Sequence, residues 1–256
     1  GTNGIVPGGT TGESPTLSHN EHKKIIEISV KECSSKIPVI AGTGSNSTDE
    51  AIELSKFAEK AGSDALLVVT PYYNKPSQEG LYQHYKKIND NVGIPIVIYN
   101  IPSRSVIDMS VETMTKLYEL KNIIGVKDAT GDLKRVELQK KSMGKDFIQL
   151  TGNDDNALEF NKLGGVGAIG VTANIAAKLS SDFQKACEED ANKAAELNEI
   201  LQPLHSAMFI ESNPSPVKYA ASLLNMCSAS VRLPLVEVQD KTKKKVSDAL
   251  KVAKLL

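Results

Sequence analysis

Lys127 stands directly after a short apolar run, residues 123–126, so that its ammonium group borders a predicted apolar interior. One interpretation is structural: the side chain extends to solvent or pairs with the adjacent Asp128. The other is chemical. An ammonium group shielded from water loses its proton more readily, and the neutral amine attacks a ketone to form a Schiff base. Because such an imine is an electron sink for carbanion chemistry, Lys127 is a candidate nucleophile.

Residues earlier in the chain supply what this chemistry needs. Tyr99 ends the preceding apolar run, and a phenol at that place can relay protons. Arg104 follows in the segment NIPSRS and can clamp a substrate carboxylate with its planar donor fork. The segment GGTTGES offers the adjacent hydroxyls of Thr10 and Thr11 between glycines. That segment fits a plain strand-to-helix turn and a carboxylate-binding loop equally well.

Seven short apolar runs, rich in Val and Ile, must position these side chains. They do not alternate with polar residues, which is typical of parallel strands covered on both faces. Amphipathic segments lie between the runs, and two of them begin with the capping-box letters S-x-x-E, at Ser18 with Glu21 and at Ser47 with Glu50. Gly62 stands where the second of these helices should end. The apolar runs are residues 4–7, 37–44, 65–71, 95–100, 123–129, 147–153 and 166–174.

Repeated strand–helix units predict an α/β fold, either a (β/α)8 TIM barrel or an open doubly wound sheet. The barrel is favoured because polar side chains follow the C-terminal ends of many different strands, and those ends meet at one mouth in a barrel. An open sheet would instead gather such residues near one switch point. The polar residues are Thr10, Thr11, Thr43, Tyr72, Tyr73, Tyr99, Asn100, Lys127, Asp128, Asn153 and Thr172.

A closed barrel of this kind needs eight strands, so the first βα unit is expected to be missing from this chain. Helical patterns at 179–190, 192–209, 214–225 and 240–255 predict a C-terminal helical extension. We therefore expect a barrel of seven visible strands at residues 1–178, with residues 179–256 forming a helical tail packed on it.

Composition narrows the classes of partner. Lys and Arg number 30 against 31 Asp and Glu, which leaves a net charge of −1 and no excess of positive charge for nucleic acid. The sequence has no apolar stretch of the roughly 20 residues that a membrane span needs. Three dispersed cysteines suit a reducing compartment, so a cytoplasmic protein is expected.

Other motifs point to neither a cofactor nor a metal. The letters GxGxxG occur at residues 165–170, but they lie inside an apolar run and not between a strand and a helix, as a dinucleotide site requires. The histidines show no metal-ligand spacing. His19 and His22 fall on the first turn of a predicted helix, where a solvated surface role is expected on position alone.

A set of ordered motifs resembles one known family. GGTTGES, AGTGSNST, TPYYNKPSQEGLYQHY, YNIPSRS, GVKDATG and LTGNDD, together with HSAMFIESNPSPVKYA near the end, are similar to dihydrodipicolinate synthases. These enzymes are pyruvate-dependent class I aldolases. The resemblance implies a lyase that condenses pyruvate with L-aspartate-4-semialdehyde in the diaminopimelate route of lysine biosynthesis. It runs the length of the chain, and the ordered set is far more specific than any single motif.

The same resemblance implies catalytic roles. Lys127 corresponds to the Schiff-base lysine, and Tyr99 to the tyrosine that shuttles protons together with Thr10 and Tyr73. In the family the tyrosine at the position of Tyr73 reaches in from a neighbouring subunit. A homo-oligomer, usually a tetramer, is therefore implied as part of the mechanism.

Substrate contacts are implied in the same way. Thr11 would hold the pyruvate carboxylate, Arg104 would bind the carboxylate of the semialdehyde, and the backbone at Gly152 and Ile169 would line the pocket. N-acetylneuraminate lyase, the nearest alternative, generally lacks the Ser-Arg pair that precedes Ser105. A truncated, non-catalytic barrel that binds a metabolite is the alternative from another class.

Feedback-inhibited members of the family bind L-lysine at a subunit interface. Inhibition by L-lysine is therefore an expectation for this chain, and Pro15 departs from the alanine that relatives often carry there. The matching positions are Ser14, His19, His22, Asn46, Glu50 and Tyr72.

Overall fold

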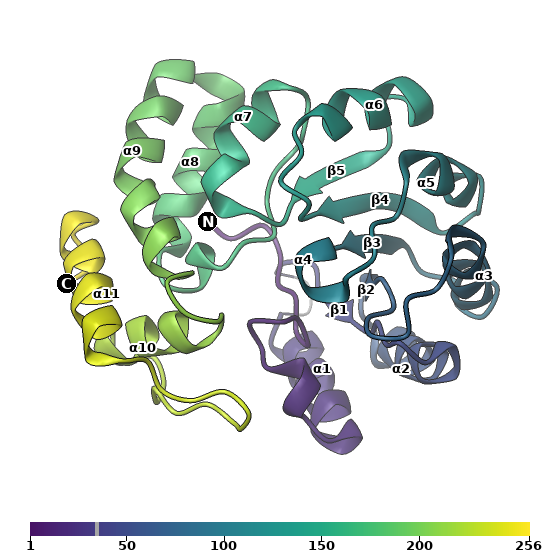
Figure 1. Cartoon of the computed structure of the whole chain (residues 1–256), viewed down its shortest axis with the longest axis horizontal. Helices are drawn as coiled ribbons and strands as arrows, with labels where there is room; N and C mark the ends of the chain where they lie inside the picture. Colours follow the sequence, from purple (N-terminus) through teal and green to yellow (C-terminus); the bar gives the residue numbers. More distant parts are fainter. Residues whose placement is uncertain (34–35) are drawn as a thin grey trace. The chain divides into compact units, whose positions relative to one another are not determined.

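The computed structural model describes residues 1–33 and 36–256 (Figure 1). The chain forms two compact units. The sheet unit comprises Gly4–Gly9 and Ser18–Ile169, and the helical unit comprises Gly1–Asn3, Thr10–Leu17 and Gly170–Leu256. The predicted division at residue 178 stays a prediction. None of the described helices is both long and apolar enough to cross a membrane.

The sheet unit is built on parallel strands that pair in chain order. In the described part of the chain these strands are β1 (Ile40–Gly42), β2 (Ala65–Val69), β3 (Ile96–Asn100), β4 (Ile123–Asp128) and β5 (Ile148–Thr151). Every neighbouring pair is parallel. The predicted α/β fold with a parallel sheet is thus confirmed.

The outermost two apolar runs do not form strands of their own. Each makes a single parallel bridge, Ile5 with Val39 and Ala168 with Thr151, so that all seven predicted runs still follow one another in order. Gly167 explains the break in the last run, because its φ of 149° leaves the extended region that a strand requires. In the first run Pro7 has no N–H to donate to a ladder.

Helices cover the sheet between successive strands (Figure 1). Along each strand, consecutive residues face opposite sides. Leu66 and Ile98 pack with the helix residues Leu81 and Met114, whereas Leu67, Val97 and Tyr99 form a second cluster on the other face. The helices are α1 (His19–Cys33), α2 (Thr48–Ala61), α3 (Gln78–Asn89), α4 (Pro102–Ser105), α5 (Val111–Tyr118), α6 (Lys134–Met143) and α7 (Ala157–Lys162).

The predicted helix ends are largely confirmed. Ser18 and Glu21 exchange hydrogen bonds as a complete capping box. At α2 the Ser47 hydroxyl accepts from the Glu50 N–H, but the Glu50 carboxylate does not return to Ser47. It bonds instead to Ser45 and His19, so the second box is only half formed. Gly62 closes α2 with a φ of 96°, as its position predicts.

The helical unit contains four longer helices among the described residues. They lie in the stretches predicted to be helical: α8 (Ala177–Glu189), α9 (Ala191–Ala207), α10 (Ser215–Leu223) and α11 (Asp240–Val252). Helix α9 packs against α8 and α11, and α11 also contacts α10. Within the same unit Lys218 pairs with Glu13 at 2.7 Å, which joins α10 to the segment Thr10–Leu17. Burial favours the neutral form of Glu13, but the hydrogen bonds and charges of Lys218 and Arg232 together outweigh it and lower the pKa of Glu13.

Candidate active site

Lys127 and Tyr99 are direct partners across strands β3 and β4. The Lys127 Nζ lies 4.0 Å from the centroid of the Tyr99 ring. Both side chains are buried, with 9% and 7% of their surfaces exposed. An amine held over a phenol ring, shielded from water and at the C-terminal end of a parallel strand, has the surroundings that a Schiff-base lysine needs.

Asp128 is not the partner of Lys127, although it is the next residue. Because side chains alternate along a strand, Asp128 faces the helix layer while Lys127 lies beside Tyr99. The Asp128 carboxylate accepts hydrogen bonds from Arg135 Nε at 2.9 Å and from Gln139 Nε2 at 3.0 Å. Thr130 donates to its other oxygen. The alternative in which Lys127 pairs with Asp128 is therefore wrong.

Gly152 leaves room for the Lys127 side chain. A Cβ added at Gly152 would lie 2.7 Å from Ala129 Cβ, which is too close, and 3.1 Å from Lys127 Cε, which is tight. Its N–H donates to Asp128 O at 2.7 Å, which fixes the turn after β5 against β4. Ile169 packs against the same cluster as Tyr99, and its N–H donates to Thr151 O. The structure thus brings Gly152 and Ile169 to the face of the sheet that carries Lys127.

Arg104 lies on the single-turn helix α4, which follows directly after β3, and it is exposed. Val106 ends this helix with a φ of 67°, an uncommon conformation for a β-branched residue. The Ser105 hydroxyl lies 2.9 Å from Ile101 O and 3.0 Å from Ile107 O, and its single proton is shared between these two carbonyls, which closes the turn on itself. Arg104 is therefore carried by a short, tightly wound loop and not by a flexible one.

Tyr73 projects from the segment after β2, with 86% of its surface exposed. Its φ is 74°, and the Asn74 N–H donates to Tyr72 O at 2.9 Å, so Tyr73 is the central residue of a γ-turn. Asn46 Nδ2 donates to Tyr72 O and Asn74 Nδ2 donates to Asn46 O. These reciprocal bonds hold a strained backbone that turns a large aromatic side chain outward.

The predicted lysine-binding residues of the sheet unit fall into separate contacts. His19 Nε2 lies 2.6 Å from Glu50 Oε1, while Asn46 and Tyr72 meet through the bond described above. His22 is buried, and its Nε2 donates to Gly42 O at 2.7 Å. A solvated role is therefore wrong for His22, since its ring fixes α1 to the end of β1.

His84 is a buried neighbour that the sequence motifs did not single out. Its Nδ1 lies 2.9 Å from the Thr48 hydroxyl, at the first residue of α2. Burial lowers the pKa of His84 to about 4, so that the ring is neutral at physiological pH. Helices α2 and α3 are thus joined by a neutral polar contact.

Thr10, Thr11 and Ser14 belong to the helical unit. Thr11 Oγ1 accepts from Asn213 Nδ2 at 3.1 Å, and Ser14 begins the short 3₁₀ helix Ser14–Thr16. The motif GGTTGES is therefore divided, because Gly8 and Gly9 belong to the sheet unit and the residues from Thr10 onward do not.

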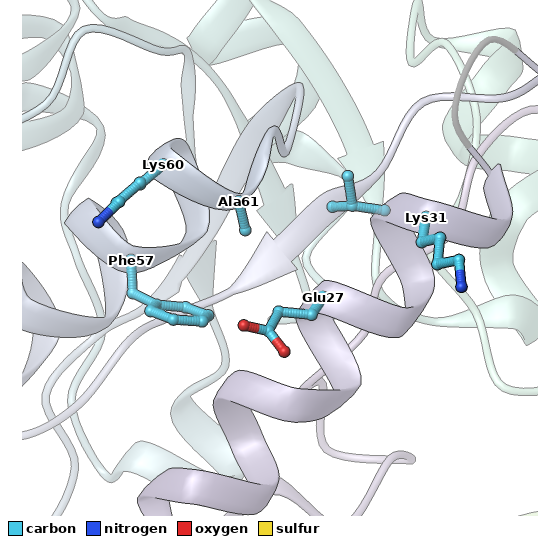
Figure 2. A pocket seen from close by; sticks show the side chains of 6 residues that line it. Glu27, Lys31, Phe57, Lys60 and Ala61 are labelled. Atoms are coloured by element: carbon cyan, nitrogen blue, oxygen red, sulfur yellow. The ribbon is translucent and has the colours of Figure 1, made fainter.

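A hollow of about 380 Å³ lies away from these residues, between α1 and α2. Figure 2 shows the Glu27 carboxylate and the Phe57 ring turned toward each other across it. Its lining comes from the C-terminal halves of both helices, whereas catalytic groups of parallel α/β barrels lie where strands end and helices begin. We assign no chemistry to this hollow. Within residues 1–33 and 36–256, no three His, Cys, Asp or Glu side chains are grouped as metal ligands.

Comparison with known proteins gives one consistent result. The profile of the dihydrodipicolinate synthetase family matches residues 1–253. The chain is 70% identical to 4-hydroxy-tetrahydrodipicolinate synthase of Pelagibacter ubique, covering 100% of this chain and 89% of the relative.

Solved structures agree with the sequence relatives. The chloride-inhibited dihydrodipicolinate synthase of Acinetobacter baumannii, complexed with pyruvate, superposes with a TM-score of 0.97 at 45% identity over 100% of this chain and 88% of that one. The enzyme of Cyanidioschyzon merolae with lysine bound gives 0.96 at 34% identity over 99% and 87%. The chain that carries Lys127, Tyr99 and the Arg104 loop therefore belongs to the dihydrodipicolinate synthetase family.

Proposed function

We propose that Lys127 is the nucleophile with which this chain condenses pyruvate and L-aspartate-4-semialdehyde, the reaction of 4-hydroxy-tetrahydrodipicolinate synthases. The observation that carries the proposal is the buried Lys127 Nζ, 4.0 Å from the Tyr99 ring. Its amine adds to the ketone carbon of pyruvate, and loss of water gives the protonated imine. Removal of a methyl proton then gives an enamine, whose carbon attacks the aldehyde of the second substrate.

Proton transfers in this sequence need a relay, which we assign to Tyr99 with Thr10 and Tyr73. Tyr99 is supported by its contact with Lys127. Thr10 and Tyr73 are supported by their places in GGTTGES and PYYNKP, which match the family's motifs. The exposed, outward-turned ring of Tyr73 supports its use by a neighbouring subunit, and so a homo-oligomer, usually a tetramer in this family.

We assign the binding of the two substrate carboxylates to two residues. Thr11 would hold that of pyruvate, and Arg104 that of the semialdehyde, since a planar guanidinium binds a carboxylate through two parallel hydrogen bonds. Gly152 and Ile169 would line the pocket through their backbone. The presence of Arg104 favours the synthase over N-acetylneuraminate lyase, for which this arginine is not expected.

We propose further that L-lysine inhibits the enzyme. The support is the lysine-bound relative from Cyanidioschyzon merolae and the retention of Ser14, His19, His22, Asn46, Glu50 and Tyr72. Glu50 is the residue suited to pair with an ammonium group, and it is already turned toward His19.

Three broader assignments rest on the same relatives. We propose a (β/α)8 barrel as the architecture of the sheet unit, with the helices α8 to α11 as its C-terminal extension. The ordered parallel pairing of seven runs supports a barrel. We also propose a cytoplasmic location, in keeping with three free cysteines and a biosynthetic reaction.

Borohydride trapping tests the nucleophile. Incubation with pyruvate and sodium borohydride, followed by peptide mass spectrometry, should place one reduced pyruvate on Lys127. Lys127→Ala should abolish both the adduct and nearly all turnover, while Lys121→Ala, in the turn before β4, should change neither. A folded native protein that takes up no pyruvate under these conditions contradicts the proposal.

A further inference from the structure

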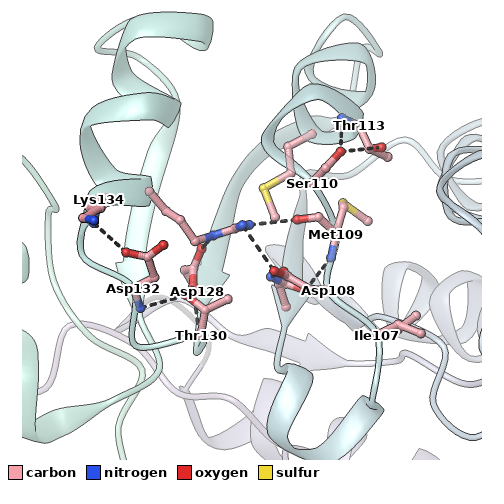
Figure 3. A network of polar contacts seen from close by, with 12 residues as sticks. Ile107, Asp108, Met109, Ser110, Thr113, Asp128, Thr130, Asp132 and Lys134 are labelled. Carbon is pink, nitrogen blue, oxygen red and sulfur yellow. Dashed lines mark hydrogen bonds and ion pairs between the residues drawn. The ribbon is translucent and has the colours of Figure 1, made fainter.

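One arginine connects the strand of Lys127 with the loop of Arg104. Arg135, in the first turn of α6, donates through Nε to Asp128 and through Nη2 to Met109 O at 2.8 Å (Figure 3). Its Nη1 lies 3.5 Å from Asp108 Oδ2. Arg135 therefore contacts the residue after Lys127 and, with the same guanidinium, the segment that follows α4. We call Asn100, Asp108, Met109, Asp128 and Arg135 the Arg135 network.

Asn100 closes the network at β3. It follows Tyr99 directly, is fully buried, and donates from Nδ2 to Asp108 Oδ1 at 2.7 Å. The Met109 N–H donates to Asn100 Oδ1 at 3.1 Å, and Asn100 O accepts from the Ala129 N–H. The loop between Asn100 and Asp108, which contains Arg104, is thus tied at its base to both β3 and β4.

Charge explains why this base is rigid. Asp128 and Arg135 are both buried, so each needs the other as a partner, and breaking a buried pair is strongly unfavourable. Asp108 is half exposed and adds a second carboxylate on the outer side of the same guanidinium. The uncommon φ of Val106, at the tip of the loop, persists only where the surrounding bonds hold it.

We propose that Asp108 and Arg135 are positioning residues, which hold the Arg104 loop against the strand of Lys127 and so set where the second substrate's carboxylate lies relative to the pyruvate adduct. The inference rests on the proposed function of Lys127 and Arg104. The Arg135 network then acts on the binding of the semialdehyde and not on the formation of the Schiff base. Small displacements of a binding group are costly, because reacting atoms must meet at a fixed distance.

Asp108→Ala is the variant of choice, because its half-exposed side chain can be removed without stranding a buried charge. We expect KM for the semialdehyde to rise about 10-fold or more, with KM for pyruvate and the borohydride adduct on Lys127 unchanged. Asp132→Ala is the matched control. It removes a nearby carboxylate that accepts from the Lys134 N–H at 3.1 Å. The bond from the Arg135 N–H goes to the backbone O of Asp132, which the substitution keeps, so the kinetics should be native.

A double variant separates positioning from direct action. If Asp108 works through Arg104, then Arg104→Ala with Asp108→Ala should be no worse than Arg104→Ala alone, whereas independent effects would multiply. Arg135→Lys, which keeps the charge but cannot bridge Asp128 and Met109, should resemble Asp108→Ala.

The outcomes distinguish the two proposals. A native protein that forms no adduct overturns the proposed function, and this inference with it. A normal adduct with an unchanged KM for the semialdehyde in Asp108→Ala overturns the positioning role alone. Multiplicative loss in the double variant, or loss of the adduct in Asp108→Ala, also overturns it.

Discussion

At the scale of single residues, Gly152 gives a sharp test of how tightly Lys127 is enclosed. In Gly152→Ala the new methyl group would lie 2.7 Å from Ala129 Cβ and 3.1 Å from Lys127 Cε, so the lysine side chain must shift by a few tenths of an ångström from its position over Tyr99. We expect the rate of adduct formation with pyruvate to fall about 10- to 100-fold. Overpacking should also lower the free energy of unfolding by about 1–3 kcal/mol. Single-turnover borohydride trapping and urea unfolding measure the two effects.

Gly93→Ala is the control for that substitution. Its added Cβ would meet only the Glu59 carboxylate, the far end of a flexible side chain, in the turn between α3 and β3. Its adduct formation should be native. Equal trapping rates in Gly152→Ala and the native protein would show that Lys127 does not need the space that Gly152 leaves.

The pair Lys127 and Tyr99 was predictable from position, since each ends an apolar run and adjacent parallel strands place such ends together. Strand alternation could also have excluded a Lys127–Asp128 pair. The second contact of Arg135, which is a partner of Asp128, could not be predicted in this way. Arg135 and Met109 are joined across 26 residues of sequence, and no local pattern specifies that contact.

At the scale of helices and strands, apolar runs predicted every parallel pairing but not where the pairing stops. Gly167 and the bulge at Ile96 and Val97 depend on local backbone angles that hydrophobicity does not encode. The capping letters at Ser47 and Glu50 show the same limit. The Glu50 carboxylate bonds to Ser45 and His19, and it therefore does not accept from the Ser47 N–H as a complete capping box requires.

The Glu50 carboxylate, which does not complete the capping box of α2, is the group to test for lysine inhibition. We expect millimolar L-lysine to reduce turnover of the native enzyme. In Glu50→Ala the half-inhibitory concentration should rise about 10- to 100-fold, which is the effect of losing one hydrogen bond to a charged group. Initial rates across a lysine titration, with both substrates saturating, measure the shift.

Glu53→Ala is the matched control on the same helix. Glu53 pairs with Lys23 at 2.6 Å and has only a minor electrostatic interaction with His19, so its loss removes an acidic side chain and an ion pair close to Glu50 but keeps the Glu50 carboxylate. Lysine sensitivity should stay native in this variant. Full activity of the native enzyme in millimolar L-lysine would remove the inhibition proposal altogether.

At the scale of the whole molecule, Tyr73 is hard to explain within one chain. A γ-turn with a φ of 74° is a strained conformation for an aromatic residue, and the ring it carries stays 86% exposed. The strained backbone of Tyr73 does not bury its ring within the same chain. The strain is explained if the ring contacts the active site of a second copy. The oligomer that we propose supplies that use, and the sequence motif alone does not show which way the ring points.

Complementation between two impaired variants tests this use directly. Lys127→Ala lacks the nucleophile and Tyr73→Phe lacks the hydroxyl, so assemblies that contain both have some sites with native Lys127 from one chain and native Tyr73 from the other. Equal co-production should restore roughly a quarter of native turnover if chains pair at random in two-fold dimers. Co-production of Lys127→Ala with the double variant Lys127→Ala and Tyr73→Phe contains no intact nucleophile and should restore nothing. If the first mixture shows no more turnover than the sum of its separate components, Tyr73 does not act across a subunit boundary, and its strained turn needs another explanation.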